Sequence, residues 1–318
     1  KKLQEWEKLG YGMFIHFGMD TYFDYEIASG NEPLEAYNPT GLDVSQWVKT
    51  AKEAGMRYAV LTAKHTSGFC LWPSAHTDHT IKNSPVKTDV VDAFVTACDK
   101  HGIMPGLYYC SWDDHHRFGS RTPGDIKREE LIAPGQQVSF TTRKYHEFQS
   151  AQIEELLTQY GKIGEVWIDI PKVLPRFYRQ ELYEAISGLQ PDALIMMNSG
   201  GNDGTTYRVD KCWPSDLVAM ERRLPNSQRG FIKWREIEGE NYYMPGEVCD
   251  PMGKEWFYGE NDRPRSDTEL LGMYLITRSR GANLLLDVPP DRTGIIPQIY
   301  TDSLMRLRSN IETFENVF

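Results

Sequence analysis

The feature that most constrains the fold of this chain is its alternation of short apolar runs with longer amphipathic stretches. The runs at 57–62 and 281–288 are largely apolar, as parallel strands buried on both faces are. Between such runs lie helical patterns, for example at 43–54, where Asp43 suits an N-cap and Gly55 a C-terminal stop. Strand–helix units repeated over 318 residues predict an α/β fold, a TIM-like (β/α)8 barrel.

The second half of the chain follows this alternation less cleanly. Residues 207–262 are rich in Trp, Pro and charge, so we expect long loops there, over one face of the barrel and with some β structure. Helices of the second half are therefore expected to be irregular or missing. A doubly wound open sheet is the alternative fold, but no G-x-G-x-x-G or Walker loop follows any predicted strand. We expect residues 1–318 to form one catalytic barrel domain.

Composition narrows the classes of function. The chain has 35 basic and 45 acidic side chains, a formal net charge of −10, and no basic run. This argues against nucleic acid or an anionic membrane as the main partner. No window reaches the roughly 18 to 20 uninterrupted apolar residues of a membrane-spanning helix. The five cysteines show no CxxC or zinc-finger spacing, so we interpret them as small buried hydrophobic residues.

Polar and aromatic side chains recur where the predicted strands end. In (β/α) barrels the carboxyl ends of the strands meet at one face, and that face carries the chemistry. We therefore expect one pocket to gather the side chains that stand at or just after these strand ends, which are His16, Lys64, His65, Tyr108, Trp112, Asp169, Asn198 and Asp287.

Asp169 is the most informative of these residues. It lies in the apolar run 166–170, where an unpaired charge would gain nothing from burial, and Trp167 points to the same side of the strand. A glycosidase needs a second carboxyl group that acts as an acid. Glu221 and Glu247 are the candidates for it, because both lie in apolar neighbourhoods that raise the pKa of a carboxyl group.

A metal centre is a competing hypothesis. The run Asp113-Asp114-His115-His116 and the pair His76 and His79 contain residue types that ligate metals. Adjacent side chains seldom converge on one ion, however, and no third and fourth ligand follow at a characteristic spacing.

At this point the residues resemble a known family, the α-L-fucosidases of glycoside hydrolase family 29. The resemblance implies a retaining exo-α-L-fucosidase that releases terminal α-L-fucose from an oligosaccharide or glycoconjugate through a covalent fucosyl-enzyme, with no metal and no organic cofactor. The matching segments run in order from about residue 6 to residue 312. They include G-M-F-I-H-F-G at 12–18, Y-N-P-T at 37–40, L-T-A-K-H at 61–65, G-F-C-L-W at 68–72, G-L-Y-Y at 106–109, W-x-D at 167–169 and G-A-N-L-L-L-D-V at 281–288.

The resemblance also implies roles for individual residues. Asp169 corresponds to the nucleophile at the end of the W-x-D strand, and His16 and His65 correspond to histidines that contact fucose hydroxyls. Glu221 precedes an aliphatic–Pro step and is the first choice as acid/base, while Glu247 matches the Glu of a later W-E-x-C segment and is the alternative. The other residues assigned to substrate binding are Glu26, Lys64, Tyr108, Trp112, Trp167 and Trp256.

The sequence departs from the family pattern in three places. Thr66 stands where a second His commonly follows, the loop at 24–27 lacks the Glu-Trp of many members, and we expect no C-terminal β-sandwich in this chain. These departures keep open a catalytically impaired fucose- or carbohydrate-binding barrel, and behind it a metal-dependent sugar enzyme. The resemblance implies a secreted, periplasmic or lysosome-like location, although the chain itself shows no signal peptide.

Overall fold

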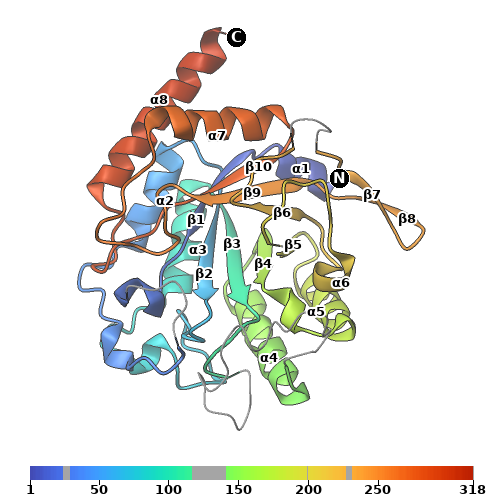
Figure 1. Ribbon diagram of the computed structural model, residues 1–318. Helices are drawn as coiled ribbons and strands as arrows, with labels where there is room; N and C mark the ends of the chain where they lie inside the picture. Colours follow the sequence, from blue (N-terminus) through green and yellow to red (C-terminus); the bar gives the residue numbers. More distant parts are fainter. Residues whose placement is uncertain (24–28, 117–140, 199, 227–230, 318) are drawn as a thin grey trace.

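The computed structural model describes residues 1–23, 29–116, 141–198, 200–226 and 231–317. Within these ranges, eight parallel strands form one sheet in the order β5-β4-β3-β2-β1-β10-β9-β6 (Figure 1). The strands of this sheet are β1 (Tyr11–Ile15), β2 (Tyr58–Lys64), β3 (Met104–Cys110), β4 (Glu165–Asp169), β5 (Leu194–Met197), β6 (Val218–Glu221), β9 (Gly246–Pro251) and β10 (Asn283–Asp287).

Hydrogen bonds bring the two ends of this strand order together. The backbone N–H of Asp216, just before β6, donates to the carbonyl of Ile195 in β5 at 2.8 Å. The backbone N–H of Met197 donates to the hydroxyl of Ser215 at 3.0 Å. The sheet therefore curves into a nearly closed barrel, and the predicted (β/α)8 fold is confirmed.

Helices cover the outside of the barrel where the amphipathic patterns predict them (Figure 1). The carboxylates of Asp43 and Asp89 accept backbone N–H bonds at the starts of two helices, as N-caps do. No helix in the described ranges is long and apolar enough to span a membrane. The helices are α1 (Lys2–Glu7), α2 (Val44–Glu53), α3 (Val90–His101), α4 (Arg143–Gln159), α5 (Arg176–Leu189), α6 (Val209–Cys212), α7 (Asp267–Ser279) and α8 (Gln298–Val317).

The stretch 207–262 contains the β structure expected there, but in a larger role than loops over one face would have. It also supplies two barrel strands, β6 and β9, whose apolar cores are too short to stand out between charged residues. Where a helix would connect them, the chain forms an antiparallel hairpin of β7 (Trp234–Ile237) and β8 (Glu240–Tyr243), which projects from the barrel in Figure 1. Because α6 is a single turn and this hairpin replaces a helix, the prediction of irregular or missing helices in the second half is confirmed.

Alternate side chains of the strands face the barrel interior and stack in layers. The middle layer is aromatic: the ring centroid of Phe14 lies 5.1 Å from that of Trp167 and 5.9 Å from that of Tyr108. The layer below is polar and includes Tyr58, which needs the bare backbone of Gly12 beside it. A Cβ atom on Gly12 would lie 2.6 Å from the Tyr58 ring. The upper layer is formed by the carboxyl ends of the strands and carries the candidate site.

Candidate active site

Two carboxyl groups of the site are hydrogen-bonded to the same side-chain amide, and all three residues stand at the carboxyl ends of neighbouring strands. Asp169 is the last residue of β4, Asn198 directly follows β5, and Glu221 is the last residue of β6. The Nδ2 atom of Asn198 donates to Oδ1 of Asp169 at 2.7 Å and to Oε2 of Glu221 at 2.9 Å. A side-chain amide carries two hydrogens, so it serves both carboxyl groups at once. The gap between the two oxygens cannot exceed the sum of these two distances.

Further hydrogen bonds fix the orientation of the Asp169 carboxylate. The phenol of Tyr108 donates to its Oδ2 atom at 2.7 Å, and the backbone N–H of Ile170 donates to Oδ1 at 2.8 Å. Ile170 adopts a left-handed backbone with φ of 48°, which is strained for a β-branched residue. The chain accepts this strain at the residue that follows Asp169.

Aromatic rings form the walls of the site. Tyr108 stacks between Trp167 and His65, with ring centroids 5.7 Å and 5.6 Å away. From the loop after β9, Trp256 and Phe257 approach the upper layer: Phe257 contacts His65 edge-on at 4.9 Å, and Trp256 lies 5.0 Å from His16. Flat apolar walls beside oriented carboxyl groups suit a pyranose ring, whose faces are apolar and whose edge is polar.

The two histidines of the upper layer are held by carboxylates. His16 Nδ1 lies 2.7 Å from Oδ1 of Asp287, the last residue of β10. Burial, and after it the nearby His65 and Arg222, lower the pKa of His16 well below its usual value, so its ring is neutral near pH 7. His65 Nδ1 lies 3.2 Å from the Thr66 hydroxyl and 3.7 Å from the carboxylate of Asp20. Both rings are therefore oriented within the site.

Comparison with known proteins agrees with this geometry. The sequence model of a family described as Alpha-L-fucosidase matches residues 21–312. The chain is 31% identical over 309 residues to Alpha-L-fucosidase 1 of Arabidopsis thaliana, covering 92% of this chain and 56% of that protein. It is 23% identical over 334 residues to human plasma alpha-L-fucosidase, covering 96% and 60%. The solved structure of α-L-fucosidase isoenzyme 1 from Paenibacillus thiaminolyticus superposes with a TM-score of 0.80 at 28% identity, covering 99% of this chain and 76% of that one.

The chain belongs to the α-L-fucosidase family. It spans a little over half of the length of the plant relative. The strand-end rule and the family motifs thus point to the same face of the barrel. Of the predicted site residues, the structure gathers His16, His65, Tyr108, Trp167, Asp169, Glu221 and Trp256 at this face.

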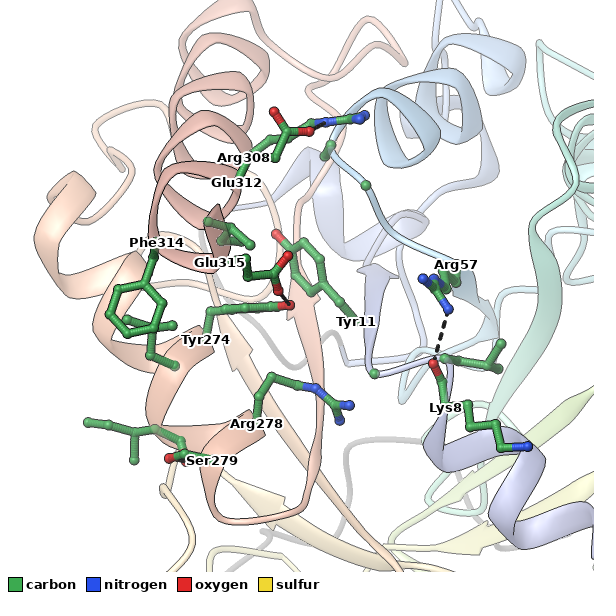
Figure 2. Close-up of a pocket in the computed structure, with 17 residues that line it drawn as sticks. Lys8, Tyr11, Arg57, Tyr274, Arg278, Ser279, Arg308, Glu312, Phe314 and Glu315 are labelled. Atoms are coloured by element: carbon green, nitrogen blue, oxygen red, sulfur yellow. Dashed lines mark hydrogen bonds and ion pairs between the residues drawn. The ribbon is translucent and has the colours of Figure 1, made fainter. Parts of the chain in front are cut away.

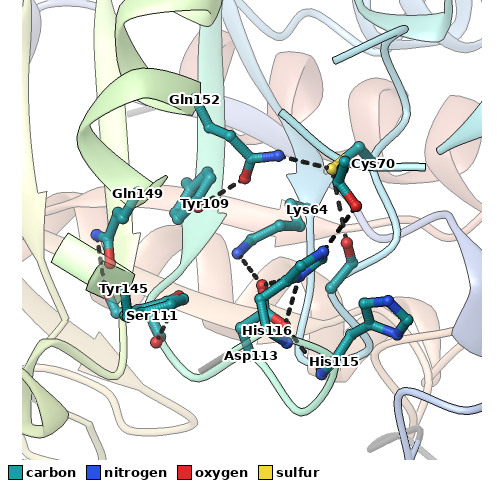
Figure 3. A network of polar contacts seen from close by, with 12 residues as sticks. Lys64, Cys70, Tyr109, Ser111, Asp113, His115, His116, Tyr145, Gln149 and Gln152 are labelled. Atoms are coloured by element: carbon teal, nitrogen blue, oxygen red, sulfur yellow. Dashed lines mark hydrogen bonds and ion pairs between the residues drawn. The ribbon is translucent and has the colours of Figure 1, made fainter. Parts of the chain in front are cut away.

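Lys64, which the sequence assigns to substrate binding, lies elsewhere: the structure does not bring its side chain to the face that holds Asp169. A register shift between Thr62 and Lys64 turns its side chain to the helix side of the sheet. There the fully buried ammonium lies 2.5 Å from Asp113 and 4.1 Å from the centre of the Tyr109 ring (Figure 3). Asp113 also binds Nδ1 of His116, and this network ties the loops after β2 and β3 together. Lys64 therefore supports the loops of the site from the helix side of the sheet.

Glu247 also lies away from Asp169. In the register of β6 with β9, Glu221 is opposite Cys249, whereas Glu247 is opposite Ala219, two residues nearer the amino end. Its fully buried carboxyl group accepts hydrogen bonds from Trp167 Nε1 at 2.8 Å and from the Tyr58 hydroxyl at 2.7 Å. The structure thus places Glu247 below the aromatic layer, and Glu221 is the carboxyl group that shares Asn198 with Asp169.

Two other residues that the sequence assigns to substrate binding, Trp112 and Glu26, are not found among the described side chains gathered at this face. Trp112 is buried, and its indole N–H donates to Asp114 at 2.9 Å, so its ring supports the loop after β3. Glu26 lies outside the described residues.

The metal hypothesis finds no support in the described part of the chain. No group of three or more His, Cys, Asp or Glu side chains there has a metal-binding arrangement. His79 stacks on His115 at 4.0 Å, and His116 Nε2 lies 2.7 Å from the hydroxyl of Thr77. The five cysteines are free and buried, as the sequence predicts.

A cavity of about 750 Å³ lies near the amino ends of β1 and β2, beside helices α7 and α8 (Figure 2). Its cationic groups already have protein partners: Arg57 donates to the carbonyl of Lys8, and Arg308 donates to Glu312. No residue of the candidate site lines it. The chemistry therefore belongs to the face that holds Asp169.

Proposed function

We propose that the chain is a retaining exo-α-L-fucosidase that removes terminal α-L-fucose from oligosaccharides or glycoconjugates. In this proposal Asp169 is the nucleophile and Glu221 is the acid/base. The observation that carries it is the shared amide of Asn198. Its nitrogen lies within 3 Å of one oxygen of Asp169 and within 3 Å of one oxygen of Glu221. Carboxyl groups of retaining glycosidases stand about 5 to 5.5 Å apart, close to the largest gap that these two bonds allow.

The reaction has two displacements. A carboxylate oxygen of Asp169 attacks the anomeric carbon while the carboxyl group of Glu221 gives its proton to the leaving oxygen, which breaks the glycosidic bond. The Glu221 carboxylate then takes a proton from water, whose oxygen attacks the same carbon and releases Asp169. Two inversions at one carbon return the starting configuration.

Neighbouring side chains bind the sugar in this proposal. His16 and His65 present ring nitrogens to its hydroxyl groups, and the stacked Tyr108 and Trp167 form the apolar wall. Trp256 lies beside His16 and supplies an apolar niche for the methyl group of fucose. Burial of these rings keeps bulk water away from the reacting carbon.

Paired variants test the assignment of the two carboxyl groups. Glu221→Ala is expected to keep slow turnover of a 4-nitrophenyl α-L-fucoside, since this leaving group departs with little protonation. Azide is expected to accelerate the reaction of this variant and to give the α-fucosyl azide. Asp169→Ala is expected to lose activity, and any azide product should have the inverted β configuration. Fucose binding by the unaltered chain without turnover would instead support a binding barrel, and an inverted product from the unaltered chain would refute retention.

We propose that residues 1–318 act as one catalytic domain, since the site draws on strands from β1 to β10. We also propose a secreted or lysosome-like setting, on the support of relatives such as the human plasma enzyme. Secretion of the natural protein into culture medium, followed by fractionation, tests this location.

A further inference from the structure

Two acidic side chains lie inside the barrel, directly below the aromatic layer. Glu165 is the first residue of β4 and Glu247 the second of β9, and both side chains are fully buried. Neither forms an ion pair with any cation of the described residues. A buried, unneutralised pair of carboxylates would be very unfavourable, so the pair needs a proton.

The hydrogen bonds around the pair show where that proton belongs. Glu247 accepts from Tyr58 on one oxygen and from Trp167 on the other. Glu165 accepts from the indole of Trp6 on Oε2 at 3.0 Å, while its Oε1 has no donor among the described residues. The charge of Glu247 acts on the pKa of Glu165, so the two carboxyl groups lie near each other inside the barrel. An oxygen that carries its own proton and donates it to Glu247 fits Oε1 of Glu165.

We propose that Glu165 and Glu247 form a proton-sharing dyad that positions the Trp167 ring as the wall of the sugar pocket. The neutral Glu165 donates to the Glu247 carboxylate, and that carboxylate holds the Trp167 indole. Trp167 in turn stacks on Tyr108, which donates to Asp169. Both members of the dyad are positioning residues. This inference rests on the proposed function only in its claim that the Trp167 ring contacts the substrate.

The groups around Glu165 and Glu247 favour a state in which the pair holds one proton near neutral pH. Burial raises the pKa of Glu247 to about 7, and burial together with the Glu247 charge raises that of Glu165 well above its usual value. Among the described residues, the other titratable groups that act on the pair are the Tyr58 phenol and the Cys249 thiol, and the charge of Arg278 acts on Tyr58. Burial raises the pKa of both Tyr58 and Cys249, so these two stay neutral. Arg278 is bound to the carbonyl of Ala282 and to Asn283.

Because these pKa values are raised in the folded state, the stability of the fold depends on pH through the dyad. An acid that is more basic in the folded state stabilises the fold below its unfolded pKa, and this contribution is lost as pH rises through the folded pKa. Above about pH 7, where Glu247 is ionised, Glu165 should still bind one proton that the unfolded chain has released.

Two conservative substitutions separate this role from simple filling of space. In Glu165→Gln the amide N–H₂ donates to Glu247 and the carbonyl accepts from Trp6, so the network survives without a titrating proton. In Glu247→Gln one neutral oxygen replaces the two carboxylate oxygens that Trp167 and Tyr58 now use, so the two donors cannot both keep their acceptors, and any bond that the Trp167 indole retains is weaker than one to a carboxylate. The two variants change the side chain by the same small amount in size, but only Glu247→Gln removes a charge, and only Glu247→Gln is expected to disturb Trp167.

The test measures three quantities on the unaltered chain and both variants. For Glu165→Gln we expect KM for 4-nitrophenyl α-L-fucoside within about twofold of the unaltered value, and for Glu247→Gln a KM about tenfold higher with a smaller change in kcat, the size of one lost hydrogen bond. The Trp167 contribution to fluorescence, taken by subtraction of a Trp167→Phe chain, should change only in Glu247→Gln.

The third quantity is the slope of unfolding free energy against pH from 7.5 to 9. It should differ between the unaltered chain and Glu165→Gln by one bound proton, which requires no activity and no folded Glu247→Gln protein. Equal slopes, or equal effects of the two Gln variants on KM and fluorescence, would overturn the dyad. A chain with the expected slopes and fluorescence but no fucosidase activity would refute the proposed function and leave the dyad standing.

Discussion

Replacing Asn198 tests the bridge between the two carboxyl groups. In Asn198→Ala, Asp169 and Glu221 each lose one hydrogen bond from the amide. A hydrogen bond to a charged group contributes about 1.5 to 3 kcal/mol, so we expect kcat/KM to fall by about 10- to 100-fold. The bonds of Tyr108 and Ile170 to Asp169 remain in this variant, so activity should not vanish.

Asn198→Asp has nearly the same shape as Asn198 but the opposite effect on its neighbours. Its carboxylate would stand within hydrogen-bond distance of Asp169 and Glu221, where the amide now donates. Unit charges 4 Å apart repel by about 4 kcal/mol at an effective dielectric of 20. We therefore expect kcat/KM at pH 7 to fall by at least about 1,000-fold, more than in the Ala variant.

The pH profile separates charge from shape. Once protonated, the carboxyl group introduced by Asn198→Asp donates as the amide does, so activity of this variant should recover partly as pH falls, and its optimum should move to lower pH. The assay is kcat/KM on 4-nitrophenyl α-L-fucoside from pH 4 to 8. Asn83→Asp, an exposed Asn beside Asp78, is the matched control and should act like the unaltered chain. Equal activity of the Ala and Asp variants at every pH would refute the reasoning.

Two further predictions concern stability, and both are measured by denaturant unfolding. Lys64→Met should destabilise the fold by about 3 to 5 kcal/mol, because it leaves Asp113 buried without its closest cation; Lys162→Met, which removes an exposed ion pair with Asp192, should change little, and equal losses would contradict the burial argument. Gly12→Ala should cost about 1 to 3 kcal/mol, because its Cβ displaces the Tyr58 ring, and Tyr58→Phe in the same background should then cost less than it does alone; additive losses would show that the ring had not moved.

Much of the barrel and part of the site follow from local sequence patterns. The apolar runs at 57–62 and 281–288 predict β2 and β10, and the capped pattern at 43–54 predicts α2, each to within a few residues, because each element satisfies its own periodicity. The strand-end rule alone selects Asp169, His16 and Asn198, because parallel strands must present their carboxyl ends at one face.

The remaining features depend on register, which single runs do not encode. Glu221 and Glu247 have similar apolar neighbourhoods, and only the pairing of β6 with β9 shows that Glu247 lies two residues deeper in the barrel. Lys64 follows the strand-end rule, but the register shift after Thr62 turns it outward to Asp113. The bridge by Asn198 joins β4 and β6 through the residue after β5, a contact that no local pattern predicts.

The central claim, that Asp169 forms the covalent bond to the sugar, is tested most directly by trapping the intermediate. Incubation with 2-deoxy-2-fluoro-L-fucosyl fluoride slows the second displacement, because fluorine destabilises the positively charged transition state. We predict that mass spectrometry will find one added fluorofucosyl group per chain, on the peptide that contains Asp169, and none in Asp169→Asn. A label on Glu221 or Glu247, or full turnover by Asp169→Asn, would contradict the account.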